Sequence, residues 1–130
     1  MQKTFSINTK ENKEVIDITN MVQDQLEDVK EGICLVFGLH TTSSIMLGEY
    51  EGGLDEDFVN MFEKLKPKGP FKHAHDPNHD PSHLFSSLVG EHVTVPVNKG
   101  RLVLGTWQRI MLVEHDGPRE RKIVVQTVKS

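Results

Sequence analysis

The chain has 130 residues, of which 36% are hydrophobic and 26% charged, and its formal net charge is −4. This length predicts a single domain, residues 1–130, with a hydrophobic core that needs no disulfides. The mildly acidic charge argues against nucleic-acid binding, which depends on basic side chains, and no apolar run is long enough for a membrane-spanning helix.

The first third of the chain predicts two strands, a helix and a buried strand. Residues 2–7 and 14–18 are interpreted as a hairpin-like pair of strands. Apolar residues recur at helical spacing after them and predict a helix over residues 20–30. The apolar run 33–37 lies between glycines and predicts a buried strand, which contains the single cysteine, Cys34. One cysteine excludes an internal disulfide, and no apolar signal core is present near the N-terminus, so we expect a cytoplasmic protein.

The middle of the chain predicts a strand, two helices and an irregular connection. Residues 41–49 are interpreted as a strand with a polar beginning, and residues 54–65 as a second helix with one apolar face. Residues 66–81 contain four prolines and three histidines and are expected to be irregular. A short third helix is predicted over residues 81–89, because proline suits the first turn of a helix.

The last third of the chain is predicted to be β-structure. Residues 92–97 alternate with period two, and residues 101–107 and 108–115 are interpreted as one long or bent strand. A last strand is predicted over residues 121–128, and Pro96 fits an edge strand or a bulge. The chain therefore predicts an α+β fold, a mostly antiparallel sheet or sandwich with two main helices and one short helix.

Histidines are unusually dense in the irregular segment. Four of the seven, His73, His75, His79 and His83, lie within 11 residues. Prolines in the segment argue against one continuous helix, so a loop would carry these side chains and a third ligand would come from elsewhere. His40, at the end of the buried strand, is the best outside candidate. Three histidines with an open position are typical of catalytic zinc; the alternative is a solvated polar loop.

Other polar residues are weaker candidates. Glu114 shares a strand face with apolar residues, and a carboxylate there needs a partner. Trp107 is either a core residue or a flat wall for a ring-shaped ligand, and Gln108 offers such a ring a donor and an acceptor. The hydroxyls of residues 41–44 are suited to a phosphate. The remaining candidates are interpreted as ordinary surface or strand positions: Arg119, Arg121, Lys122, His92 and His115. Of these, Arg119 could pair with an anion.

Several segments, taken in order, resemble the YjbQ-like family (UPF0047), whose members are also called secondary thiamine-phosphate synthases. The resemblance covers nearly the whole chain. It is carried by Gly105-Thr106-Trp107-Gln108 with the later Glu114, His40-Thr41-Thr42-Ser43-Ser44, Phe71-Lys72-His73, Asn78 through His83 with Ser86 to Gly90, Val95-Pro96-Val97 with Gly100-Arg101, and Asp116-Gly117-Pro118-Arg119.

This resemblance implies an α+β homotrimer with a metal-bearing pocket. It implies that the metal ligands are His40, His73 and His83, the catalytic residues Glu114, Gln108 and Arg119, and the substrate-binding residues Thr41, Thr42, Glu49, Asn78, Thr106 and Trp107. Two local departures leave choices open. His75 stands close to His73, so either is a candidate ligand, and Gly48-Glu49-Tyr50 replaces the family's Asn-Glu-Asn type of segment.

The activity implied by the resemblance joins a hydroxymethylpyrimidine diphosphate to a thiazole phosphate and releases pyrophosphate. Imidazole ligands favour zinc, whereas a diphosphate substrate is more often served by magnesium. A zinc hydrolase of a small phosphorylated substrate is therefore an alternative, and so is a non-catalytic trimer that binds a metabolite or a metal. In each case the expected partner is a small molecule, with no nucleic acid and no membrane.

Overall fold

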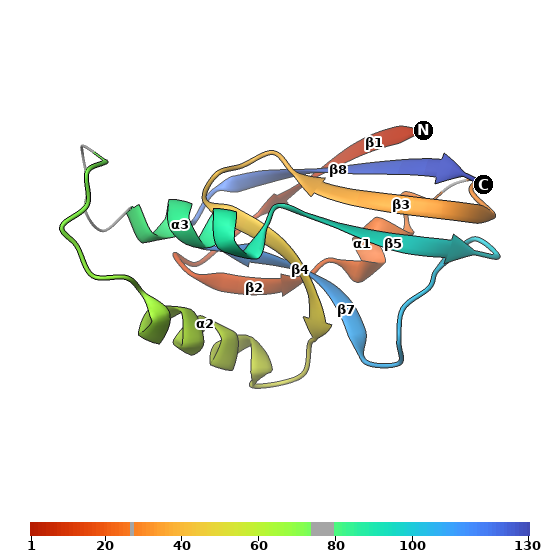
Figure 1. Ribbon diagram of the computed structural model, residues 1–130. Helices are drawn as coiled ribbons and strands as arrows, with labels where there is room; N and C mark the ends of the chain where they lie inside the picture. The colour runs from red at the N-terminus through yellow and green to blue at the C-terminus, as the bar shows by residue number, and fades with distance from the viewer. Residues whose placement is uncertain (27, 74–79) are drawn as a thin grey trace.

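The computed structural model describes residues 1–26, 28–73 and 80–130, and its strands form two antiparallel sheets (Figure 1). The five-stranded sheet has the order β1-β8-β3-β5-β6, with bounds Gln2–Asn8, Glu120–Lys129, Glu31–Gly38, His92–Asn98 and Arg101–Leu102. The three-stranded sheet has the order β2-β7-β4, with bounds Glu14–Asp17, Gln108–Glu114 and Ser43–Glu49. The described helices are α1 (Thr19–Gln23), α2 (Leu54–Leu65) and α3 (Asp80–Val89).

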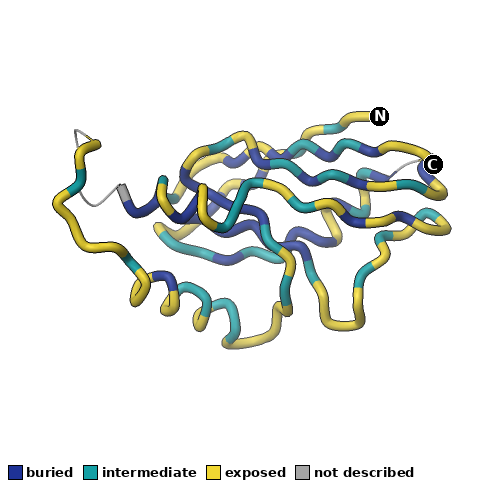
Figure 2. The backbone as a smooth tube through the Cα atoms, in the orientation of Figure 1, coloured by how far each residue is buried: buried dark blue, intermediate teal, exposed yellow. Residues whose placement is uncertain are grey.

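The three-stranded sheet is the middle layer of the molecule. One of its faces contributes Ile110 and Leu112 to the core between the two sheets, and the other contributes Met111 and Val113 to a second core under the helices. Helix α2 packs on β2 and α3 packs on β4, as Figure 1 shows. In Figure 2 the buried parts of the chain therefore lie in the middle of the molecule. The fold is α+β, as predicted, and each layer buries the apolar face of the next.

The predicted hairpin between the first two strands is wrong. Strand β1 pairs with β8 in one sheet, whereas β2 pairs with β7 in the other. Residues 9–13 lead from one sheet to the other, because Ile7 and Ile18 both have to reach the core between the sheets. Alternation of apolar residues predicts a strand but does not identify its partner.

The first helix is much shorter than predicted. Helix α1 ends at Gln23, and Leu26 donates its backbone N–H to the Gln23 carbonyl in a tight turn that leaves the helix. Leu26 and Val29 are nevertheless buried in the core, so their spacing reflects burial rather than helix. Helix α3 has 10 residues and α1 has 5, so the short helix is the first and not the third.

The strand predicted over residues 101–107 is also largely wrong. Strand β6 covers Arg101–Leu102, and the chain then leaves the sheet before β7 begins at Gln108. Pro96 in β5 accepts a hydrogen bond from the Val103 N–H through its carbonyl. In an antiparallel strand the N–H and C=O of one residue face the same side, so the missing proline N–H faces the short edge of the sheet. Cys34 is fully buried, as expected.

No helix in the described ranges is long and apolar enough to cross a membrane.

Substitution of Gly32 tests the close pairing of β3 with β8. A Cβ built on Gly32 would overlap the Val128 carbonyl oxygen, and its φ of +154° disfavours other residues. We expect Gly32→Ala to lower the free energy of unfolding by about 2 kcal/mol, measured by urea titration. Gly52, which has nothing within 4 Å, is the matched control, and Gly52→Ala should change stability by less than about 0.5 kcal/mol. Equal midpoints for the two variants would contradict the described pairing.

Candidate functional site

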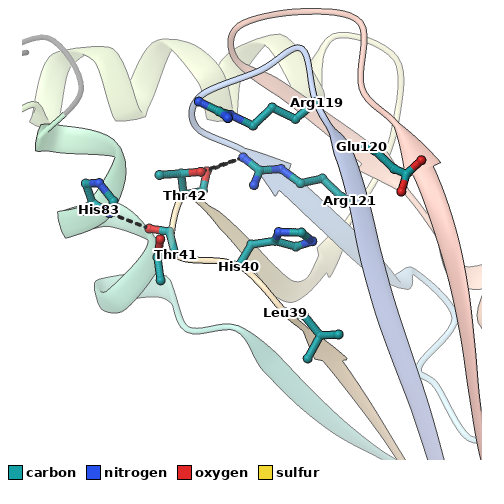
Figure 3. Close-up of a pocket in the computed structure, with 8 residues that line it drawn as sticks. All are labelled: Leu39, His40, Thr41, Thr42, His83, Arg119, Glu120 and Arg121. Atoms are coloured by element: carbon teal, nitrogen blue, oxygen red, sulfur yellow. Dashed lines mark hydrogen bonds between the residues drawn. The ribbon is translucent and has the colours of Figure 1, made fainter.

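A cavity of about 660 Å³ lies where β3, β4, β8 and α3 meet (Figure 3). Residues 39–42 connect β3 to β4, residues 119–121 lead into β8, and His83 extends from α3. The lining consists of Leu39, His40, Thr41, Thr42, His83, Arg119, Glu120 and Arg121. Side chains from three separate parts of the sequence therefore share one polar cavity.

Glu114 lies behind this cavity in a buried ion pair with Arg121. The Arg121 Nε donates to Glu114 Oε2 over 2.8 Å, and its Nη2 donates to Oε1. The Thr9 hydroxyl and the Asp116 backbone N–H donate to the same carboxylate, over 2.8 and 3.0 Å. Burial alone would raise the pKa of the Glu114 carboxyl, but these donors, with the Arg121 hydrogen bond the largest, hold it below its usual value. The predicted partner of Glu114 is thus Arg121.

The interpretation of Arg121 as surface charge is wrong. Its side chain is 3% exposed, and its Nη2 also donates to the Thr42 carbonyl and hydroxyl oxygens over 3.1 and 2.8 Å. Arg121 lies on the same face of β8 as the buried Ile123 and Val125, at every second position. This period of two places Arg121 on a buried face, and the inward carboxylate of Glu114 needs a partner. Together these two features of the sequence indicate that Arg121 is the buried partner of Glu114.

His40 lies in the cavity as a neutral hydrogen-bonding group. Its Nε2 accepts the Lys122 backbone N–H over 2.7 Å, so the ring proton of the neutral imidazole is on Nδ1. Burial, together with the Arg121 charge, lowers the pKa of His40. This hydrogen bond uses the nitrogen lone pair that a metal would need.

His83 and His73 are placed differently. The His83 Nδ1 lies 3.2 Å from the Thr41 carbonyl oxygen, so Nδ1–H donates there and Nε2 carries the lone pair, the arrangement usual for a metal-ligating histidine. The His73 ring lies against it edge to face, with centroids 5.1 Å apart. Within the described ranges, no group of three or more His, Cys, Asp or Glu side chains converges. His73 and His83 thus lie together, whereas the Nε2 of His40 is occupied by the Lys122 N–H. His75, Asn78 and His79 lie outside the described residues.

Arg119 stands at the exposed rim of the cavity. Its Nη2 lies 2.8 Å from the Asp116 carboxylate, and its Nε donates to the Asp116 carbonyl over 2.7 Å. Its side chain is about half exposed. The charge of Arg119 is therefore largely matched by Asp116 before any ligand arrives.

Four predicted site residues lie at the other end of the same strands. In the β4–β7 ladder Glu49 pairs with Gln108, whereas Ser43 pairs with Glu114. The two pairs lie six positions apart along each strand, a distance of about 20 Å. Trp107 is 72% exposed, so its interpretation as a core residue is wrong, and Thr106 beside it is also exposed. Gln108 accepts the Gly105 N–H through Oε1. One chain therefore does not bring these residues to the cavity.

His115 fastens the middle sheet to helix α3. Its Nε2 lies 3.0 Å from the Ser44 hydroxyl, and the Ser82 hydroxyl donates to its carbonyl over 2.9 Å. Its ring packs against Phe62 and Phe85. Burial lowers the pKa of His115 to about 4. This histidine, like the exposed His92 on β5, has a place in the strand framework, and it helps to position the helix that carries His83.

Comparison with known proteins gives one consistent family. The family model described as UPF0047 protein YjbQ-like matches residues 3–130. A UPF0047 protein of Archaeoglobus fulgidus is 41% identical over 125 residues, 95% of this chain and 98% of that protein. UPF0047 protein YugU of Bacillus subtilis is 35% identical over 129 residues, 97% of this chain and 98% of that protein.

Solved structures agree over the full length. A YbjQ-like protein of unknown function from Sulfolobus solfataricus is 38% identical with a TM-score of 0.92, covering 100% of this chain and 97% of that one. A hypothetical protein from Aeropyrum pernix is 36% identical with a TM-score of 0.93, covering 100% and 99%. The names of these proteins give a family and no activity.

The depressed pKa of His115 predicts a loss of stability on mild acidification. The unfolded chain takes up this proton near pH 6.5 and the folded chain near pH 4, so the free energy of unfolding should fall by about 3 kcal/mol between these values. Urea titrations across this range measure the slope. In His115→Gln, which keeps a polar group near Ser44, most of that slope should vanish, while the loss below pH 4.5 from Glu114 remains. An unchanged slope in the variant would contradict the assignment.

Proposed function

Because the chain belongs to the YjbQ-like UPF0047 family, we propose that it is an enzyme that acts on small phosphorylated molecules, of the secondary thiamine-phosphate synthase type. The observation that carries the proposal is the cavity itself. Two arginines, a histidine that presents an N–H and two threonines border a space of about 660 Å³. Such donors are suited to phosphoryl oxygens, and the volume is in the range of small-molecule sites.

The proposed reaction makes one bond and breaks one. The thiazole nitrogen attacks the methylene carbon of the hydroxymethylpyrimidine diphosphate, and the C–O bond to the diphosphate breaks. Pyrophosphate leaves with the bonding electron pair, so negative charge grows on the leaving group in the transition state. Fixed N–H donors that face this charge accelerate the reaction. In this proposal the donors bordering the cavity bind the diphosphate, with Arg119 and the Thr41 hydroxyl at the exposed rim.

A divalent metal remains part of the proposal. In this proposal the protein ligands are His83, through Nε2, and His73, with zinc favoured by imidazole nitrogen and magnesium possible where a diphosphate supplies oxygen ligands. When bound, the metal would act as a Lewis acid on phosphoryl oxygen. His40 is not included, because its Nε2 accepts the Lys122 N–H.

A homotrimer would bring the two separated groups of site residues together. Trp107 is highly exposed on a loop about 20 Å along β7 from the cavity, and Figure 1 shows the loop before β7 at the opposite end of that strand from the start of β8. An exposed tryptophan is typical of binding surfaces. We therefore propose that Trp107, Thr106, Gln108 and Glu49 of one subunit recognise the ring of a substrate bound by the next.

A zinc hydrolase of a small phosphate ester is the second candidate. It is favoured by the hydrogen bond from His83 Nδ1 to the Thr41 carbonyl, which is the outer-shell support that zinc-bound histidines usually have. The activity test below separates the two reactions.

Substitution of His83 tests the activity. Purified protein supplied with both thiamine precursors and a divalent metal should form thiamine phosphate and pyrophosphate. His83→Ala should lower kcat/KM about a hundredfold or more, measured by chromatography of the product. His92→Ala is the matched control, because His92 is an exposed histidine that does not line the cavity, and it should retain activity. Turnover of phosphate esters without thiamine phosphate would favour the hydrolase, and saturable binding with no turnover would favour a non-catalytic protein.

Mixed trimers test whether subunits share the site. His83→Ala and Trp107→Ala should each be inactive alone. Refolded together at equal concentration, they should recover roughly a quarter of the native activity, because random assembly joins two intact halves in one site of four. Sedimentation velocity measures the oligomer, and the product assay measures recovery. No recovery in confirmed mixed trimers would place both side chains in the site of a single subunit.

A further inference from the structure

We propose that the cavity is a built receptor for a phosphoryl group, with Arg121 Nη1 and His40 Nδ1 as its fixed donors, and that His40 is a hydrogen-bond donor rather than a metal ligand. The inference deepens the proposed function, since it rests on a phosphorylated substrate in the same cavity. It concerns binding of the anion, which is measured without turnover.

Arg121 provides the first donor. Two of its three guanidinium nitrogens are committed: Nε to Glu114, and Nη2 to Glu114 and Thr42. Nη1 has no hydrogen-bond partner within the part of the chain that the structure describes, although the side chain is 3% exposed. A buried donor without an acceptor is costly. Because Arg121 lines the cavity and Glu114 does not, Nη1, on the side away from Glu114, is the nitrogen available to a ligand there.

His40 provides the second donor. The Lys122 backbone N–H points at its Nε2 over 2.7 Å, and a backbone amide cannot reverse its polarity. Moving the ring proton to Nε2, to make Nδ1 a metal ligand, would set two N–H groups against each other. His40 therefore keeps its proton on Nδ1 and donates. In Figure 3 its ring lies in the cavity with the Arg121 side chain.

The surrounding charges favour recognition by hydrogen bonds over attraction by bulk positive charge. Glu114 balances Arg121 and Asp116 balances Arg119. Glu120 also lines the cavity, and in Figure 3 its carboxylate points away from Arg121. The Arg121 and His40 donors are held in place, so they cost little reorganisation when charge arrives. Donors from different sides match a tetrahedral phosphoryl group, which has several acceptor oxygens, better than a planar carboxylate. Glu114 is then a positioning residue: it fixes the Arg121 plane and does not touch the ligand.

Nitrogen-15 NMR of the native protein tests both donors without a substitution. The His40 ring should show the tautomer with hydrogen on Nδ1. Inorganic phosphate and pyrophosphate should shift the His40 ring and Arg121 side-chain signals, and acetate should bind at least about tenfold more weakly. Added zinc should leave the His40 tautomer unchanged. A zinc-induced loss of the His40 Nδ1 proton, or phosphate binding that leaves both residues unshifted, would overturn the proposal. Absence of zinc binding would contradict the proposed metal site but would not affect the proposed phosphoryl receptor.

A double variant tests the contribution of Arg121 to affinity. Arg121→Met alone would strand a buried carboxylate, so it is combined with Glu114→Gln, whose single amide oxygen keeps an acceptor for the Asp116 N–H. Circular dichroism checks the fold, and calorimetry should show phosphate binding at least about tenfold weaker. Lys122→Ala is the matched control: it removes an exposed positive charge next to Arg121 and leaves the backbone N–H on His40, so affinity should change less than about twofold. An equal loss of phosphate affinity in the two variants would show that binding depends only on overall positive charge, and it would contradict the proposal.

Discussion

The buried ion pair between Glu114 and Arg121 joins the two sheets of this protein at the cavity. Glu114 ends β7 of the middle sheet, and Arg121 lies near the start of β8 in the larger sheet. Through the hydroxyl and carbonyl of Thr42 the same guanidinium also holds the connection between β3 and β4. Removing one partner would leave an uncompensated charge in the interior. The cavity wall and the register of three chain segments therefore depend on one interaction.

The helical side of the cavity depends on a separate set of contacts. Ser82 donates to the His115 carbonyl and Ser86 to the Ser43 carbonyl, so α3 is fastened to β4 and to the end of β7 along its inner face. His83 lies between these two serines in the sequence and extends toward the cavity. These hydrogen bonds fix the orientation of α3 on the sheet, which apolar packing of Phe85 alone would leave less defined.

The sequence predicted local structure and burial better than it predicted partners. Period two along residues 108–115 identified a strand and the inward Glu114, but it did not distinguish a strand buried on one face from β7, which is buried on both. Spacing at Leu26 and Val29 indicated burial and was mistaken for helix. His40, Thr41, Thr42, Arg119 and His83 were brought together as expected, while Trp107 was not. Neither outcome follows from spacing, because tertiary contacts and assembly decide which ends of strands meet.

The double burial of β7 has a consequence for how this protein family can change. A strand whose alternate residues fill two different cores cannot gain or lose one residue, because a shift of one position would exchange Ile110 and Leu112 with Met111 and Val113 and turn Glu114 toward the helices. We therefore expect the number of residues between Trp107 and Glu114 to stay the same as the sequence changes. New specificities can arise by substitution in the exposed loop before β7, at a fixed distance from an unchanged cavity.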